Sequence, residues 1–327
     1  MSEAGAELDV ACLEEFWASH VEGAMRLDEM VVKLLLDTLG LGNQQAYRKL
    51  ILERPSFPEF TRWIVETAGL PDPVLVDRFH AWLYEIEPGE EAKARLAAIK
   101  HAEPVFGEAA LRHWDEHGYV VLPDAIGHDE IAAVRDLVWA EVGGTPGDPD
   151  SWYRPREDGI MVARFQHPAL EAARRSPRIM KAFAQLWETE NLWCTIDRMG
   201  FNPPERPGHE FAGSDLHWDV SLAQPIPFGT QAVLYLVDTS ADMGAFRCVP
   251  GFHKRIDEWL DELGPAADPR AVDLHAGQHH VAGRAGDLVI WRQDLPHGAS
   301  PNRSDRPRLA QYLNFYSPDM IIHQRWR

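Results

Sequence analysis

The chain has 327 residues, 45% of them hydrophobic, which is enough for one large domain or two unequal ones with a substantial core. It has 32 lysine and arginine residues against 51 aspartate and glutamate residues, a formal net charge of −19. This acidity argues against nucleic acid and anionic membranes as main partners, although a pocket for a small substrate can still be basic.

Residues 1–105 are predicted to form an all-helical N-terminal region, because apolar residues recur at helical spacing and prolines mark helix ends. The first ten residues are polar and acidic, unlike a signal peptide, and the apolar run 30–36 is too short to span a bilayer. With three widely separated cysteines and no disulfide pattern, we expect a cytoplasmic protein. The helical region could cap the next domain, form a homodimer or bind another partner.

Residues 106–327 are predicted to form a second unit, mainly β with flanking helices. A helix at 111–117, a strand at 119–122 and a helix capped by Asp129 open it. Further helices are predicted at 179–186 and 256–263, and short strands at 161–166, 192–199, 231–237, 278–281, 287–291 and 309–316. Many short strands separated by turn signals favour an antiparallel sandwich or barrel.

The motif around which the chain is organised is His217-Trp218-Asp219, taken together with His297. In a β-strand, residues two apart point to the same face, so His217 and Asp219 would converge while Trp218 faces away. Two histidines and one carboxylate form the facial triad of non-haem Fe(II) oxygenases, which leaves positions open for a co-substrate and O2. The proline- and glycine-rich loop 201–215 leads into this motif and is predicted to be a functional lid.

A 2-oxo acid bound to iron would bring its second carboxylate into a confined pocket, where arginine is the best partner. Arg308 follows His297 by eleven residues, at the start of a predicted strand, and a hairpin would return it beside His297. Arg306 competes for this role, because it lies two positions earlier and therefore on the same face.

Several motifs, in order and spacing, resemble the phytanoyl-CoA dioxygenase family. They are Leu216–Asp219, Tyr235–Thr239, Val249–His253, Gly286–Trp291, Leu295–Gly298 and Arg306–Arg308. Members of this family are Fe(II)- and 2-oxoglutarate-dependent oxygenases with a double-stranded β-helix (jelly-roll, cupin-like) core. The resemblance covers about residues 111–316 and leaves out the helical N-terminus. It implies His217, Asp219 and His297 as iron ligands and Arg308 as the 2-oxoglutarate anchor.

The resemblance also implies secondary contacts and one departure. Arg164, Gln166, Asn202 and Tyr235 lie on elements that should line the cavity, and Asn202 and Tyr235 are candidates for binding 2-oxoglutarate. Many members have Ser or Thr two residues after the second histidine. Here Ala299 occupies that position and Ser300 follows it, so Ser300 is the remaining candidate. Related halogenases replace the metal carboxylate with a small residue, so Asp219 favours oxygen transfer over halogenation.

The predicted function is therefore an Fe(II)- and 2-oxoglutarate-dependent dioxygenase that uses O2 to hydroxylate or otherwise oxidise an unactivated C–H bond of a small molecule. An amino acid or a secondary metabolite is the expected substrate, with release of succinate and CO2. Three alternatives stay open: a cupin-like metal enzyme that does not use 2-oxoglutarate, a catalytically silent jelly-roll binding protein, and a zinc hydrolase. Arg308 argues against the first alternative, and the intact triad argues against the second.

Overall fold

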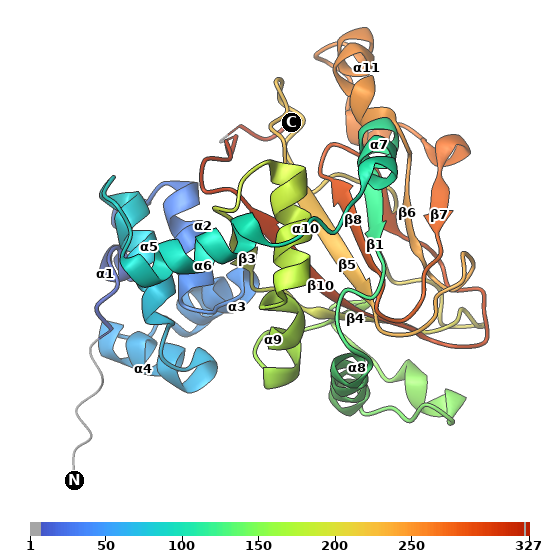
Figure 1. Cartoon of the computed structure of the whole chain (residues 1–327). Coiled ribbons are helices and arrows are strands. Elements are labelled where there is room, and N and C mark those ends of the chain that lie inside the picture. The colour runs from blue at the N-terminus through green and yellow to red at the C-terminus, as the bar shows by residue number, and fades with distance from the viewer. Residues whose placement is uncertain (1–7, 324) are drawn as a thin grey trace.

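The computed structural model describes residues 8–323 and 325–327, and it combines helices with antiparallel sheet (Figure 1). The helical prediction for the N-terminal region is confirmed from residue 8 on, and residues 1–7 lie outside the described part. The helices of this region gather on one side of the molecule in Figure 1. They are α1 (Leu13–Val21), α2 (Glu29–Thr38), α3 (Asn43–Arg48), the π-helical turn η1 (Lys49–Glu53), α4 (Phe57–Ala68), α5 (Pro73–Leu83) and α6 (Glu90–His101).

Local sequence explains where several of these helices begin. The Asp28 carboxylate accepts a hydrogen bond from the Met30 N–H at the start of α2, and Asp72 does the same at the start of α5. Two of the prolines lie in the first turn of a helix, Pro58 in α4 and Pro73 in α5. Proline fits there because the first N–H groups of a helix have no partner within it.

The second unit opens with α7 (Glu108–His117), β1 (Tyr119–Leu122) and α8 (His128–Val142), as predicted. The prediction that Asp129 caps this helix was wrong. Gly127 caps α8, and its N–H donates to the Glu130 carboxylate at 2.7 Å. Asp129 lies in the first turn, where its negative charge is favourable next to the helix N-terminus.

Two antiparallel sheets follow. The large sheet has the strand order β1-β8-β5-β10-β4-β2, and β3 also pairs with β10. The small sheet has the order β7-β6-β9. The strand bounds are β2 (Met161–Val162), β3 (Trp193–Thr195), β4 (Met199–Asn202), β5 (Thr230–Tyr235), β6 (Phe246–Cys248), β7 (His279–Val281), β8 (Leu288–Arg292), β9 (His297–Ala299) and β10 (Arg308–Tyr316). The later helices are α9 (Pro168–Arg174), α10 (Pro177–Trp187) and α11 (Ile256–Leu263), with short 3-10 turns η2 (Pro149–Tyr153), η3 (Phe252–Lys254), η4 (Pro269–Ala271) and η5 (His275–Gly277).

The structure corrects several of the predicted strands. The strand at 161–166 is only the two residues of β2, because the chain leaves the sheet and begins α9 at Pro168, a helix that the sequence did not indicate. The strand at 192–199 is divided between β3 and β4. The motif His217-Trp218-Asp219 is not in a strand: His217 forms an isolated bridge with His297, and the backbone bends at Asp219. His297 itself begins β9 instead of lying in a loop.

The helical region is joined to the sheets by a shared core and by buried polar contacts. Trp193 of β3 and Tyr316 of β10 belong to the same hydrophobic cluster as the buried side chains of α1, α2 and α4. The Tyr316 hydroxyl donates to Asp37 Oδ2 at 2.6 Å, and the Ile196 N–H donates to Asp37 Oδ1 at 3.1 Å. Of the roles considered for this region, packing against the following unit is the one that the structure shows directly.

Replacing Tyr316 with phenylalanine is expected to lower the free energy of unfolding by about 1–3 kcal/mol, because it removes one of the two donors to a buried carboxylate. Denaturant unfolding measures this change. Tyr84→Phe is the control, since Tyr84 is 60% exposed and its loss should change stability by less than about 0.5 kcal/mol. Equal stability of the two variants would contradict a stabilising role for the Tyr316–Asp37 contact.

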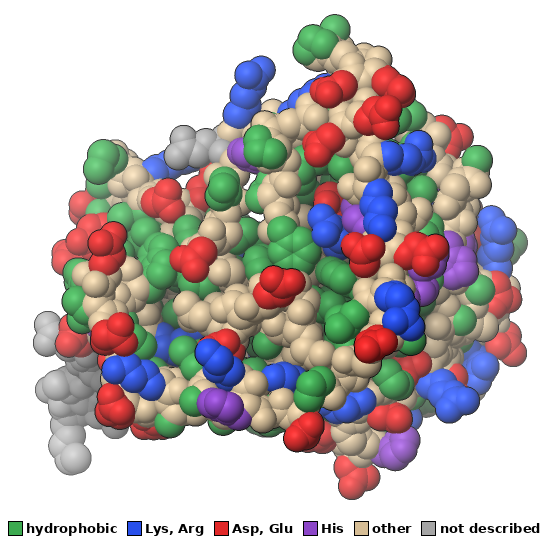
Figure 2. Space-filling view, turned by 45° about the horizontal axis from the view of Figure 1, so that its top comes forward, with side chains coloured by type: hydrophobic (Ala, Val, Ile, Leu, Met, Phe, Trp, Pro, Cys, Tyr) green, Lys and Arg blue, Asp and Glu red, His purple; other side chains and the backbone are tan. Residues whose placement is uncertain are grey.

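Within the described residues, no helix is both long enough and apolar enough to cross a bilayer. The face presented in Figure 2 has acidic and basic side chains interspersed, with hydrophobic side chains between them. Whether the protein avoids nucleic acid and membranes, as its charge suggests, stays a prediction.

Candidate metal centre and co-substrate pocket

The structure brings His217, Asp219 and His297 together, although no strand carries the first two. One ligand atom from each of the three residues lies within 4.8 Å of the others, and this is the one such cluster among the described residues. His217 Nε2 is 3.5 Å from Asp219 Oδ1, and His297 Nε2 is 3.3 Å from Asp219 Oδ2. Two imidazole nitrogens and a carboxylate therefore face one point, as a facial triad requires.

Backbone contacts set the orientation of both imidazole rings. His217 and His297 exchange two backbone hydrogen bonds of 2.9 and 3.0 Å, which hold their Cα atoms side by side. The Nδ1 atom of His217 is 2.6 Å from the Asp215 carbonyl oxygen, and Nδ1 of His297 is 3.0 Å from the Leu295 carbonyl oxygen. A carbonyl oxygen can only accept, so both Nδ1 atoms carry the proton. The two Nε2 atoms are thereby left free to bind a metal.

The electrostatics of the cluster favour an ionised carboxylate. Partial withdrawal from water disfavours the charged form of Asp219, but the adjacent His217 and His297 imidazoles outweigh this and hold its pKa well below the usual range. Burial lowers the pKa of His217, and the adjacent Asp219 more than reverses this, so that the pKa is raised. The cluster thus presents a negative charge at a point where a cation would bind.

Two residues that the sequence reasoning missed hold Asp219 in place. Gln231 Nε2 donates to Asp219 Oδ2 at 2.7 Å, and Gln231 in turn accepts a hydrogen bond from Trp291 Nε1 at 3.2 Å. The Arg270 guanidinium donates to the carbonyl oxygens of Trp218 at 2.6 Å and Val220 at 2.7 Å, one on each side of Asp219. Gln231 could have been suspected from its place on the inward face of a predicted strand, whereas no local pattern marks Arg270.

We expect Gln231→Leu to weaken Fe(II) binding by about 10- to 100-fold, because partners that orient a metal ligand typically contribute that much. The dissociation constant is measured by anaerobic titration of the metal-free protein. Gln224→Leu serves as the control, since the Gln224 side chain is exposed and, among the described residues, bonds only to Asp257. A Gln231→Leu protein that binds Fe(II) as tightly as the wild type would show that this hydrogen bond has no positioning role.

A single cavity of about 450 Å³ contains the triad and opens between the two sheets. Its walls come from the large sheet through β5 and β10 and from the small sheet through Phe246 of β6 and the strand β9. The predicted lid loop contributes Ala212, Gly213 and Ser214 to the lining. The loop therefore lies against the site, and its role as a lid stays a prediction.

Arg308 projects into the same cavity and has no acidic partner within ion-pair distance among the described residues. It is only 2% exposed. Its Nε donates to the Gly244 carbonyl oxygen at 3.1 Å and its Nη1 to the Tyr312 hydroxyl at 3.3 Å. A Cβ atom on Gly200 would lie 3.2 Å from Nη1, so this glycine leaves room for the guanidinium. A buried cation without a counter-charge is costly, and an anionic ligand would remove that cost.

The competitor Arg306 is excluded from this pocket, because its side chain is 71% exposed and lies 3.5 Å from Asp305. The two arginines would share a face if both were in one strand, but only Arg308 is within β10. Arg306 precedes the strand, so the alternation of faces does not extend to it.

The polar groups of Asn202, Ser300 and Tyr235, the secondary candidates for binding 2-oxoglutarate, are engaged with the backbone. Asn202 donates to the Ser300 carbonyl oxygen at 3.0 Å, and the Ser300 hydroxyl donates to the Ala245 carbonyl oxygen at 2.9 Å; neither residue lines the cavity. Tyr235 does line it, but its hydroxyl donates to Val281 and accepts from the Phe246 N–H. These side chains bond to the protein's own backbone, which the sequence could not reveal.

Two residues expected on the cavity wall lie elsewhere as well. Arg164 is half-exposed and 3.5 Å from Glu141, and Gln166 bonds to Gly40 and Gln45 of the helical region. The polar side chain that does lie beside Arg308 is Tyr312, four residues further along β10.

Residues 114–310, more than half of the chain, match the family described as "Phytanoyl-CoA dioxygenase (PhyH)". The chain belongs to the phytanoyl-CoA dioxygenase family. This match confirms the resemblance drawn from the motifs. It also confirms the predicted enzyme class, an oxidoreductase that depends on Fe(II) and 2-oxoglutarate.

Relatives within and around this family share low identity with the chain over most of its length. A putative phytanoyl-CoA dioxygenase of Dictyostelium discoideum is 20% identical over 268 residues, which covers 65% of this chain and 76% of that protein. An ectoine dioxygenase of Bordetella bronchiseptica is 22% identical over 260 residues and covers 70% and 83%. Among solved structures, the non-haem alpha ketoglutarate dependent carbocyclase SnoK from nogalamycin biosynthesis is 21% identical, with a TM-score of 0.48, over 68% of this chain and 90% of that one.

Proposed function

We propose that His217, Asp219 and His297 hold Fe(II) and that Arg308 anchors 2-oxoglutarate in the same cavity. The observation that carries this proposal is the presence, in one cavity, of a two-histidine, one-carboxylate cluster and a buried arginine without a counter-charge. The donor set fits Fe(II), and three ligands on one side leave the remaining positions for the 2-oxo acid and O2. When bound, the iron and 2-oxoglutarate supply the oxidation of a C–H bond, with release of succinate and CO2.

The chain's own residues have distinct tasks in this scheme. Arg308 neutralises the second carboxylate of 2-oxoglutarate, and the Tyr312 hydroxyl beside it offers a further hydrogen-bond partner. Gln231 and Arg270 fix the direction of Asp219. The aromatic rings of Phe246 and Trp291, stacked with centroids 4.3 Å apart, form an apolar wall that keeps water from the reacting bond.

The proposed reaction is hydroxylation, or a related oxidation, of a small molecule such as an amino acid or a secondary metabolite. Relatives named ectoine dioxygenase and methylphosphonate hydroxylase support a small substrate. Asp219 supports oxygen transfer over halogen transfer, because it fills the coordination position that a halide would need. A metal enzyme that does not use 2-oxoglutarate would leave Arg308 without a purpose, and a silent binding protein would not need the triad.

The proposal extends to the architecture. The two antiparallel sheets that face each other across the cavity would be the double-stranded β-helix of residues 106–327, preceded by the helical region 1–105. A cytoplasmic location and a homodimer through the N-terminal helices stay predictions.

The decisive experiment is an anaerobic titration of the metal-free protein with Fe(II) and then 2-oxoglutarate, monitored by the weak visible charge-transfer band of the chelate. We expect the band to appear only when both are present. Absence of the band at saturating concentrations of both would contradict the proposed function.

A further inference from the structure

The helical region, which lies outside the matched family segment, supplies a cation to the catalytic cavity. Lys33 of α2 lines the same cavity as the triad, together with Thr195 and Arg198 from the chain between β3 and β4. None of these three residues was singled out by the sequence. Lys33, Thr195 and Arg198 together form the outer cluster of the cavity lining.

The strand register places Thr195 of the outer cluster at the end of the cavity opposite Arg308, whereas Arg198 lies nearer the middle of β10, where its carbonyl oxygen accepts from the Tyr312 N–H at 2.9 Å. Arg308, Tyr312 and Asn314 lie on one face of β10 and line the cavity, and the Cα atoms of the first and last are about 20 Å apart along an extended strand. Thr195 pairs with Asn314, and its hydroxyl accepts a hydrogen bond from Lys33 Nζ at 3.2 Å. With 2-oxoglutarate at the Arg308 end, the Lys33 end is left for the substrate.

The Lys33 ammonium has donors to spare. Its one hydrogen bond goes to Thr195, and it lies 3.9 Å above the centre of the Tyr316 ring. The Asp37 carboxylate forms a long ion pair with the ammonium at 3.8 Å, beyond hydrogen-bonding distance, and its two oxygens already accept from Ile196 and Tyr316. An ammonium has three N–H donors, so two remain for a ligand.

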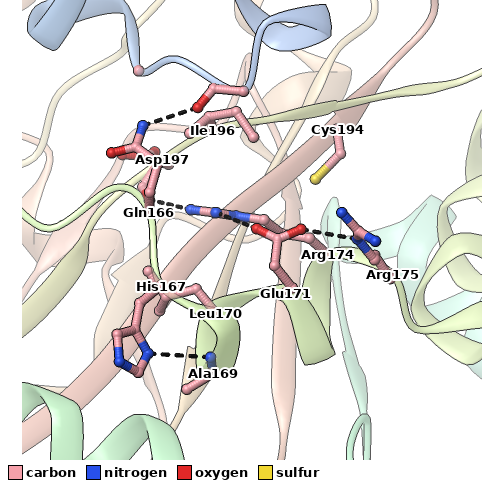
Figure 3. Close-up of polar contacts among 12 residues, drawn as sticks. Gln166, His167, Ala169, Leu170, Glu171, Arg174, Arg175, Cys194, Ile196 and Asp197 are labelled. Atoms are coloured by element: carbon pink, nitrogen blue, oxygen red, sulfur yellow. Dashed lines mark hydrogen bonds and ion pairs between the residues drawn. The ribbon is translucent and has the colours of Figure 1, made fainter. Parts of the chain in front are cut away.

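Arg198 adds a second cation on a firmly held segment. Its Nη1 donates to Gln44 of α3 at 2.7 Å, and its Nη2 makes no hydrogen bond with any described residue. Figure 3 shows how α9 supports this segment: Arg174 reaches from Glu171 to the Asp197 carbonyl oxygen, with distances of 2.8 Å at each end. The neighbouring Asp197 carboxylate accepts from the Arg198 backbone N–H at 2.7 Å and lies 3.5 Å from Arg198 Nε, so it offsets part of the charge of this guanidinium and leaves Nη2 open.

We propose that the outer cluster is a substrate subsite for an anionic group, a carboxylate or a phosphonate, bound by Lys33 and Arg198. The inference rests on the proposed function, because it takes the Arg308 end to be filled by 2-oxoglutarate. It assigns the helical region a role in specificity: α2 delivers the charge that selects the substrate, and the Asp37–Tyr316 contact holds α2 against the cavity. Two cations with open N–H donors favour an anion over a neutral analogue, because the neutral group offers those donors a weaker acceptor.

The test uses the Fe(II)·2-oxoglutarate protein under anaerobic conditions, with matched sets of small carboxylic acids, alkylphosphonates and the primary amides of the same acids as probes. Binding is followed by the change in the charge-transfer band when a probe approaches the iron. We expect acids from at least one of the two anionic sets to bind. The matched amides should bind with an affinity at least about tenfold lower. The set that binds more tightly identifies carboxylate or phosphonate as the recognised group.

Substitutions then assign the preference to Lys33. Lys33→Met should remove the discrimination between acid and amide, and Lys33→Arg should restore most of it. Lys93→Met is the control and should keep the discrimination between acid and amide. Lys93 lies on the exposed side of α6, and its ion-pair partners among the described residues are Glu87 and Glu90. Arg198→Met provides a second test should Lys33→Met fail to fold.

Three outcomes would overturn the subsite: amides that bind as tightly as acids, a Lys33→Met protein that keeps the preference, or no anionic probe that alters the band. Failure of the band to form before any probe is added would contradict the proposed function instead, so the two proposals fail in distinguishable ways.

Discussion

Asp219→Ala is expected to weaken Fe(II) binding more than about 100-fold and to abolish turnover of 2-oxoglutarate. Asp219 is the one carboxylate of the cluster, and it lies within 3.5 Å of both imidazole Nε2 atoms. Its removal leaves two neutral ligands for a divalent cation. The loss of metal affinity should exceed the roughly 10- to 100-fold loss that is typical when a residue supporting a ligand is removed. Anaerobic Fe(II) titration and succinate formation measure the two effects.

Asp305→Ala is the matched control for this substitution, because Asp305 is 93% exposed and does not line the cavity. It should bind Fe(II) as the wild type does. Full hydroxylation by the Asp219→Ala protein would mean that the carboxylate is not a metal ligand, and the triad would then have to be reassigned.

Arg308→Met should raise the concentration of 2-oxoglutarate needed for half-saturation by about 100-fold or more, with Fe(II) binding much less affected. The substitution removes the only described cation at that end of the cavity and leaves a bound carboxylate buried without a partner, a change that typically costs about 3–5 kcal/mol. Titration of the Fe(II) protein with 2-oxoglutarate separates this effect from one on the metal.

Arg306→Met tests whether position or charge alone is responsible. Arg306 is two residues away and carries the same charge, but its side chain is exposed, so its loss should leave 2-oxoglutarate affinity within about twofold of the wild type. Equal losses in the two variants would point to a general electrostatic effect and against a specific anchor at Arg308.

Local sequence was sufficient to predict the helical N-terminal region, most of the strands and the family. Helical spacing of apolar residues and turn signals between short apolar runs are properties of neighbouring residues. The observed elements that follow them closely are α7, β1, α8, α10, β5, α11, β7, β8 and β10. The ligand types were also readable, since iron accepts few side chains and the order His217, Asp219, His297 carries the family pattern. The predicted geometry of the motif was wrong in one respect: a single bridge to His297, and not a strand, brings the ligands together.

Only the tertiary structure decided which residues share the cavity. It selected Arg308 over Arg306 by burial, and it assigned Asn202 and Ser300 to backbone contacts outside the lining. It also brought Lys33 to the same cavity from far along the chain. The physical reason is that metal ligands are specified by their own chemistry, whereas burial, counter-charge and hydrogen-bond partners depend on segments that meet only when the sheets and the helical region have packed together.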